Sequence, residues 1–294
     1  MKIRTYAPTD APKLVRLLNE TQRREYEFIP YSEQSFLSEV KEGNATVLVA
    51  EEKGIEGFAM LYRGEHGEEL RWLCVKRGKR EKEVEDLLVT SIEREARGER
   101  LFVVVDSQNV SRIADFVRRG YEVYGGLYQM TVKLTQTFPI LSIPEGIVLR
   151  SLAPNEENVL IKIVNTAFKG ERLRSGVIEK WKSQDPLFNE EWVHVAEING
   201  EMVSVVVAKR DREFNEFFHQ KRGYIGPVAT LPNYSMRGIA KALTCKAMNF
   251  LLSKGMDSVC IYTTENNMAS QALFKSLGFE VRHNWKFLRK IRNK

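Results

Sequence analysis

The sequence has few of the residues from which cross-links and metal sites are built. Only three cysteines and four histidines occur in 294 residues. Cys74, Cys245 and Cys260 lie far apart in apolar runs, and neither they nor the histidines have the spacing of metal ligands. We therefore expect three buried free thiols, no bound metal and a reducing, cytoplasmic environment.

Long apolar runs are missing as well. No run approaches the roughly 20 residues of a membrane span, and the chain starts Met-Lys-Ile-Arg without the apolar core of a signal peptide. We therefore expect no membrane partner.

The net charge is only +6, and the basic residues are dense only at 76–80 and 289–294. Neither stretch is interleaved with aromatic residues, which disfavours nucleic acid as a partner.

The chain does have enough apolar material for two cores. Its length and its 43% of hydrophobic residues fit two domains of average size. Pro139 and Gly146 lie in a segment that follows a strand-like apolar run, and both residue types interrupt secondary structure. The sequence thus predicts domains over 1–135 and 147–294, joined by a linker over 136–146.

Two pairs of similar segments predict that the domains are copies of one fold. IRTYAPTD at 3–10 is echoed by LRSLAPNE at 149–156. Near the end of each copy, four residues recur with equal spacing, namely Asn109, Phe116, Gly120 and Tyr121 and then Asn267, Phe274, Gly278 and Phe279. Similar segments in the same order indicate a duplicated domain.

Apolar periodicity predicts the same element order in both copies. The first copy has strands 46–51, 57–62, 70–75 and 101–106 with helices 83–96 and 110–118, and the second has strands 193–197, 201–209, 224–229 and 258–263 with helices 238–254 and 268–277. This order predicts an α/β (α+β) fold, a mixed sheet flanked by helices, in each domain. Residues 212–223 are expected to form a mobile polar loop.

The strongest chemical signal is PNYSMRGIAKAL at 232–243, between a strand and the longest predicted helix. The first N–H groups of a helix have no intrahelical partners, and the helix dipole favours an anion there. Gly238 lets a diphosphate approach the backbone, Ala240 keeps the first turn slim, and Arg237 adds positive charge. An ordinary strand–turn–helix connection with a convenient glycine is the alternative explanation.

This loop resembles the acyl-CoA loop of the GNAT superfamily of N-acyltransferases, Arg/Gln-x-x-Gly-x-Gly/Ala. Gly238 and Ala240 match the pattern, whereas Ser235 replaces its first residue. The stretch over 267–279 is similar to the family's later motif, Asn-x-x-Ala/Ser-x-x-Leu-Tyr-x-x-x-Gly-Phe, and both motifs occur in the family's order. Two such domains in one chain resemble the tandem, mycothiol synthase-like acetyltransferases.

The resemblance implies that an acyl group passes from acyl-CoA, expected to be acetyl-CoA, to a primary amine by direct attack on the thioester. The implied cofactor-binding residues are Val228, Ala229, Thr230, Ser235, Met236, Arg237, Gly238, Ile239, Ala240, Asn267, Ser270 and Phe274. The backbone at 228–230 is expected to stabilise the developing oxyanion. Phe274 stands where many members carry a Tyr that protonates the CoA thiolate, so another group or water must supply that proton.

No catalytic base follows from the sequence. Tyr224 and His219 are candidates because they lie near the strand that precedes the loop, but ordinary solvated positions explain both. The acceptor also stays open: a small amine, an antibiotic, a peptide N-terminus and a lysine side chain all fit.

At the matching loop the first half reads KRGKREKEV over 76–84. Aligned from the following helix, Lys82 and Val84 stand at the positions of the two small residues, where bulk excludes a diphosphate, and Glu81 and Glu83 repel it. The first domain is therefore predicted to be degenerate. A two-residue shift, with Gly78 as the cradle glycine, is the alternative.

Two other classes of function stay open. A catalytically silent acyl-CoA-binding or scaffold protein would have the same two motifs. A nucleic-acid-binding module that uses the basic tail would show salt-dependent binding.

Overall fold

The computed structural model describes residues 1–42, 44–64, 67–140, 143 and 145–292. The chain forms two compact units, one made of Met1–Leu127 with Asn284–Lys294, the other of Tyr128–His283. Both units have a mixed sheet and flanking helices, which confirms the predicted fold class. The units differ from the expected linear ranges 1–135 and 147–294, because strands β6 (Glu122–Lys133) and β12 (Glu280–Ile291) each contribute residues to both. Residues 141, 142 and 144 of the expected linker lie outside the described residues.

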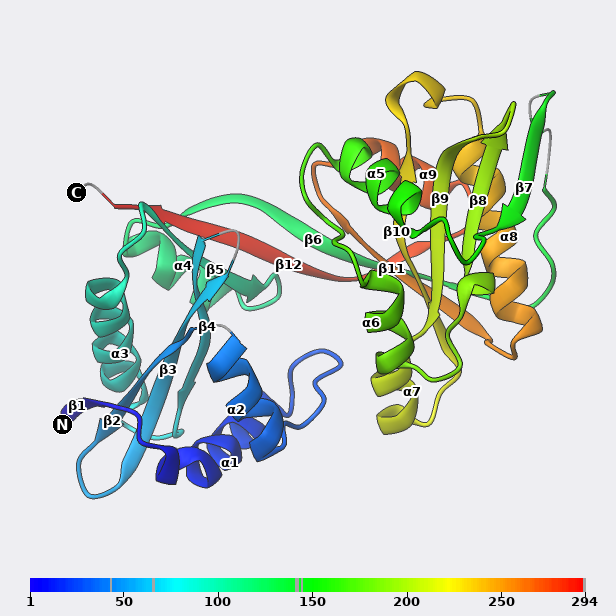
Figure 1. Cartoon of the computed structure of the whole chain (residues 1–294). Helices are drawn as coiled ribbons and strands as arrows, with labels where there is room; N and C mark the ends of the chain where they lie inside the picture. Colours follow the sequence, from blue (N-terminus) through cyan, green and yellow to red (C-terminus); the bar gives the residue numbers. More distant parts are fainter. Residues whose placement is uncertain (43, 65–66, 141–142, 144, 293–294) are drawn as a thin grey trace. The chain divides into compact units, whose positions relative to one another are not determined.

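Unit 1 begins with a four-stranded antiparallel meander (Figure 1). The meander consists of β1 (Lys2–Thr5), β2 (Thr46–Glu51), β3 (Ile55–Gly64) and β4 (Gly67–Val75), and β5 (Arg100–Asp106) also lies wholly in unit 1. Its helices are α1 (Ala11–Gln22), α2 (Glu33–Glu42), α3 (Glu81–Glu95) and α4 (Val110–Arg118), with a 3-10 turn η1 (Pro8–Asp10). β5 is parallel to β4, and residues 285–291 of β12 pair antiparallel with β5.

The strands of unit 1 bury side chains on both faces. Leu48 and Ala50 of β2 pack in one cluster with Leu88 of α3, whereas Val47 and Val49 pack in another with helices α1 and α2. Such alternation is the period-two pattern of a strand covered on both sides.

Unit 2 repeats this plan. Its strands are β7 (Ile147–Ser151), β8 (Val193–Ile198), β9 (Glu201–Arg210), β10 (Arg222–Thr230) and β11 (Ser258–Thr264). Its helices are α5 (Glu157–Phe168), α6 (Val177–Gln184), α7 (Arg212–Phe218), α8 (Ile239–Ser253) and α9 (Met268–Lys275), with 3-10 turns η2 (Glu190–Trp192) and η3 (Pro232–Tyr234). The strand order within unit 1 is β1-β2-β3-β4-β5-β12, and within unit 2 it is β11-β10-β9-β8-β7.

Two local expectations are corrected by these elements. The segment predicted as a mobile polar loop over 212–223 forms helix α7 and the start of β10. Phe214 is 7% exposed and the Arg222 guanidinium lies 3.2 Å from its ring centroid, so this polar-looking segment is fixed by an aromatic contact. Helix α3 begins at Glu81, two residues before the predicted start.

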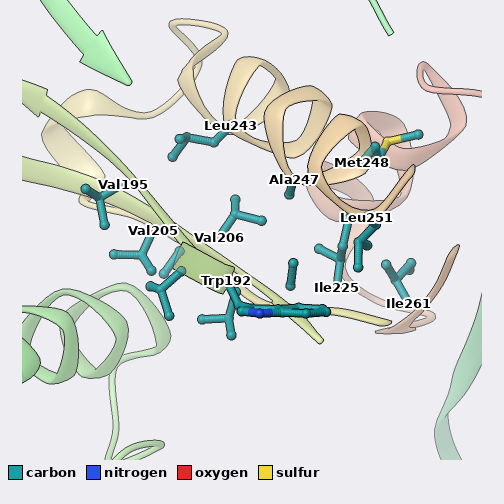
Figure 2. Close-up of a cluster of buried hydrophobic side chains, with 14 of the residues drawn as sticks. Trp192, Val195, Val205, Val206, Ile225, Leu243, Ala247, Met248, Leu251 and Ile261 are labelled. Atoms are coloured by element: carbon teal, nitrogen blue, oxygen red, sulfur yellow. The ribbon is translucent and has the colours of Figure 1, made fainter. Parts of the chain in front are cut away.

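The longest predicted helix of unit 2 packs as its periodicity indicated. Ile239, Leu243, Ala247 and Leu251 are each at most 1% exposed. Figure 2 shows Leu243, Ala247 and Leu251 on α8, in one cluster with the sheet residues Val206 and Ile225. The four-residue repeat therefore forms the apolar stripe by which α8 covers one face of the sheet.

The repeated N-terminal segments form the same contacts in both units. The Arg4 guanidinium donates to both carboxylate oxygens of Asp10 at 2.6 and 2.9 Å and to Glu51 at 2.8 Å. Arg150 donates likewise to Glu156 at 2.7 Å twice and to Glu197 at 2.8 Å. These contacts tie the turn after each first strand to the next strand of the sheet. A forked guanidinium–carboxylate pair fixes orientation more tightly than a single contact.

Leu288 provides a test of the composition of unit 1. It is fully buried in the cluster that includes Leu88 and Leu101, although it lies near the end of the sequence. Leu288→Ala is expected to lower the free energy of unfolding of unit 1 by about 2–5 kcal/mol, since a cavity is left. Ile291→Ala, at a 60% exposed position of the same strand, is the control. Amide hydrogen exchange should rise in α3 and not in α8; the reverse pattern would contradict the assignment of residues 284–292 to unit 1.

Candidate active site

Strands β10 and β11 of unit 2 pair over only three positions. The parallel register joins residues 222–224 to 258–260 and stops at Tyr224 and Cys260, while β10 continues to Thr230. On its other side β10 stays paired with β9, with an irregularity between Ile225 and Val228 that holds the cis peptide Gly226-Pro227. Beyond Tyr224 the backbone of β10 therefore has no partner in β11, and we call the place where this pairing ends the strand opening.

The residues expected at the end of this strand lie next to that opening. Val228, Ala229 and Thr230 pair with residues 206–204 of β9. The buried Ser204 hydroxyl donates to the Ala229 carbonyl at 2.9 Å and lies 2.7 Å from the Thr230 hydroxyl. The Thr230 hydroxyl is thus hydrogen-bonded within the protein.

The predicted anion loop forms an exposed helix start. Gly238 is the N-cap of α8 with φ +79°, a conformation that favours glycine, and a Cβ there would meet no atom within 4 Å. Ser235, Met236 and Arg237 are exposed, whereas Ile239 is buried. The first described backbone bond of the helix runs from the Ala242 N–H to the Gly238 carbonyl. The preceding N–H groups are the ones that a helix start leaves for an anion.

Two side chains shape the edge of this loop. The Arg237 guanidinium lies 5.4 Å from the ring centroid of Tyr234, so its charge is held beside the helix start. Met236, at φ +61°, is 96% exposed. The open space at Gly238, the free first turn and the adjacent cation together fit a diphosphate group.

The second motif begins helix α9. The Asn267 side chain accepts a hydrogen bond from the Ser270 N–H at 3.1 Å and is therefore the N-cap of α9. Phe274 is 4% exposed and packs edge-on against Phe279 at 5.1 Å between ring centroids. Its side chain therefore belongs to the core of unit 2, and no hydroxyl is available at this position.

The corresponding loop of unit 1 has a different start. Its first helical bond runs from the Val84 N–H to the Arg80 carbonyl, so Arg80, not Lys82, is the counterpart of Gly238. The Arg80 guanidinium donates to Glu83 at 2.9 and 3.0 Å and to Glu52 at 2.6 Å. A long side chain and two carboxylates thus stand at the helix start that is open in unit 2.

The two base candidates lie in different surroundings. His219 is the exposed C-cap of α7 and precedes β10, at the end of that strand away from Gly238. Tyr224 is the last residue of β10 that pairs with β11, and its hydroxyl lies 2.6 Å from where a Cβ on Gly226 would be. Burial, together with Cys260 and Asp211, raises the pKa of Tyr224 to about 12. The structure brings Tyr224 to the strand opening and leaves His219 away from it.

Sequence reasoning missed Lys209, the residue of β9 opposite Tyr224. Burial, and then the charge of Lys180, lowers its pKa to about 8. The sequence did carry a signal, since Lys209 stands near the end of a valine-rich strand. Lysine is common at strand ends, however, so this signal is not specific.

Within the described part of the chain, no group of three or more His, Cys, Asp or Glu side chains is arranged to hold a metal ion. The same residues include no helix that is long and apolar enough to cross a membrane.

Comparison with known families agrees with this geometry. Residues 159–279 match the acetyltransferase (GNAT) family. The matched range contains the strand opening, the Gly238 loop and the Asn267 motif. The chain therefore carries a GNAT acetyltransferase domain.

Individual relatives extend the likeness to both units. A mycothiol acetyltransferase of Nocardia farcinica is 28% identical over 271 residues, which is 86% of each chain. Two other proteins of that name, from Thermobispora bispora and Renibacterium salmoninarum, match over 66% and 49% of their own length.

Solved structures support the fold. A GCN5-related N-acetyltransferase from Sphaerobacter thermophilus has a TM-score of 0.71 at 20% identity and covers 99% of this chain and 96% of its own. A tandem GNAT protein from the clavulanic acid biosynthesis pathway has a TM-score of 0.66 at 13% identity, with 98% and 97% covered. The two-unit architecture thus has precedent among tandem GNAT proteins.

His194 of β8 is buried against Phe250 of α8. It is 1% exposed, its ring centroid lies 5.1 Å from that of Phe250, and neither ring nitrogen has a hydrogen-bond partner among the described residues. Burial, and then the charge of Lys246, lowers its pKa to about 4.

Stability should therefore fall in mild acid. The unfolded chain binds a proton at His194 below about 6.5, whereas the folded chain does not until about 4. Between these values the free energy of unfolding should drop by up to about 1.4 kcal/mol per pH unit. His194→Leu should flatten this part of the pH profile in urea titrations, and His219→Leu, at an exposed position, should not. An unchanged profile in His194→Leu would contradict the assignment.

Proposed function

We propose that unit 2 is an acyl-CoA-dependent N-acyltransferase that transfers an acetyl group from acetyl-CoA to a primary amine. The observation that carries the proposal is the open start of α8 at Gly238, adjacent to the end of β10, where β10 and β11 have separated. The helix start at Gly238 suits the phosphate end of such a ligand. The part of β10 that is not paired with β11 suits its extended arm. The relatives named mycothiol acetyltransferase support acetyl transfer.

Different residues of unit 2 would bind the donor, stabilise the oxyanion and position the reactants. The first-turn N–H groups of α8 and Arg237 hold the diphosphate. Backbone N–H groups along 228–230 hydrogen-bond the thioester carbonyl and stabilise the oxyanion that develops. Asn267 caps α9 and keeps its start next to the arm of the donor. Most of the rate enhancement comes from holding the two reactants in attacking geometry.

A catalytically silent acyl-CoA-binding protein is the second candidate. The buried position of Phe274 favours it, because no tyrosine hydroxyl is present there to protonate the thiolate. In an active enzyme, water that enters between β10 and β11 would supply that proton. The two candidates make the same prediction for binding and opposite predictions for turnover.

Unit 1 is proposed to be a degenerate copy that binds no CoA. Arg80 with its two glutamate partners stands at the helix start, and α3 has Glu81 and Glu83 in its first turn. Charge repulsion and bulk both oppose a diphosphate at this position.

A cytoplasmic location is part of the proposal. Cys74, Cys245 and Cys260 are buried and not joined in disulfides, as expected for a reducing compartment.

Gly238→Glu should abolish binding of CoA at the α8 start, with at least a 100-fold loss of affinity. A carboxylate about 4 Å from the diphosphate costs on the order of 4 kcal/mol per charge pair near a protein surface. Isothermal titration calorimetry with CoA measures the effect. The matched control is Gly255→Glu at the other end of α8, since Gly255 also has positive φ and no atom within 4 Å of a Cβ. Equal affinities of the two variants would refute the placement of the diphosphate.

Turnover separates the two candidate functions. Acetyl-CoA is incubated with glucosamine, kanamycin, a short peptide or N-protected lysine methylamide, and released CoA is measured with a thiol reagent. Release that depends on an amine and is lost in Gly238→Glu supports the enzyme. CoA binding without release in any mixture would favour the silent protein.

A further inference from the structure

Lys209 lies at the point where the strands of unit 2 separate. It is the cross-strand partner of Tyr224, and Tyr224 is the last residue of β10 that pairs with β11. Gly223 faces α8, because a Cβ there would meet the side chain of Leu251. Successive residues of a strand point to opposite faces, and directly opposed residues share a face. Tyr224 and Lys209 therefore lie on the face away from α8.

The Lys209 amine has an aromatic neighbour and no acid. Its Nζ lies 4.0 Å from the ring centroid of Trp181 on α6. Two acids of the neighbouring segments are already paired: Asp185 accepts from Arg210 at 2.8 and 2.5 Å, and Asp211 accepts from Arg222 at 2.9 Å. No hydrogen bond or ion pair to Lys209 occurs among the residues that the structure describes.

We propose that Lys209 is the catalytic base of unit 2 and takes the proton from the amine of the acceptor. This inference rests on the proposed acyl transfer. It assigns the catalytic base, which could not be identified from the sequence.

The charges around Lys209 suit that role. Lys180 is the charged neighbour on α6 that disfavours a second ammonium, and Tyr224 on β10 keeps its proton because its pKa is about 12. The adjacent Asp185–Arg210 pair is compensated within itself. Burial is the main reason that the pKa of Lys209 falls to about 8. A base works best when its pKa is close to the operating pH, so a substantial share of Lys209 is neutral where most lysines are charged.

The proton balance is complete without another reactant. The acceptor arrives as an ammonium and gives one proton to the neutral Nζ of Lys209. Its nitrogen then attacks the thioester carbonyl, so that a C–N bond forms and the C–S bond breaks. The sulphur leaves with the electron pair of that bond and takes the second proton of the nitrogen, directly or through water. Lys209 returns its proton to solvent.

Three variants test the proposal with the acceptor that gives the fastest turnover in the panel. Lys209→Met removes the base, and Lys209→Arg keeps the positive charge but cannot be neutral near pH 8. Both should lower kcat by about 100-fold or more, the usual contribution of a positioned base, while CoA affinity stays unchanged. Lys162→Met, at an exposed position of α5, is the control for the substitution.

The pH profile distinguishes a base from a structural lysine. In the wild type kcat should rise through about pH 8, and the midpoint should stay there with two acceptors whose amines differ in basicity. The variants should lose this limb. Activity retained in Lys209→Arg would mean that only the charge matters, and full activity in Lys209→Met would mean that the residue is dispensable; either result overturns the proposal.

A direct titration needs no acceptor. In protein labelled with 13Cε-lysine, the resonance that is absent from Lys209→Arg should titrate near 8, and a midpoint near 10 overturns the proposal. If no amine supports turnover by the wild type while this resonance titrates near 8, it is the proposed acyl transfer that fails.

Discussion

The chemistry that unit 2 can perform depends on an interruption in backbone pairing. β10 and β11 are parallel neighbours for three residues and then separate, whereas β10 stays attached to β9. The pairing with β11 ends at Tyr224, and the unpaired start of α8 lies at the other end of the segment 225–238. A phosphate-bearing ligand with an extended arm needs both features.

Unit 1 has the same interruption without the same helix start. β4 pairs with β5 only at residues 68–70, and β4 continues to Val75. The Arg4–Asp10 and Arg150–Glu156 contacts, and the Asn109 and Asn267 caps, recur as well. At the start of the helix that follows this strand, the units differ: Arg80 with its glutamate partners stands in unit 1 and Gly238 in unit 2.

Much of this could be predicted from the sequence because it follows from local rules. The α8 stripe, the Asn267 cap and the glycine at the helix start depend on residues close together in the chain, where periodicity and capping preferences are informative. The predicted start of α3 lies two residues too late because the residue before the helix, Arg80, is no typical N-cap and makes no capping hydrogen bond. Helix α7 was not predicted because its many polar residues suggested a loop. The contact between Phe214 and Arg222 that holds it in place cannot be recognised from the sequence.

Such local rules could predict neither the pKa of Lys209 nor which segments make up each unit. The pKa of Lys209 depends on its burial beside Trp181 and on the partners of the nearby acids, and both are set by the tertiary structure. Likewise, no local signal shows that residues 285–291 pair with residues 100–106.

That pairing has a consequence for synthesis. During translation the first unit emerges from the ribosome without the strand that carries Leu288, and it can close its core only after residue 288 has been made. Contacts so distant along the chain are slow to form, and incomplete sheet edges are prone to aggregate. Unit 1 should therefore be the later of the two to reach its native form, and a nascent chain stalled before β12 should depend on chaperones.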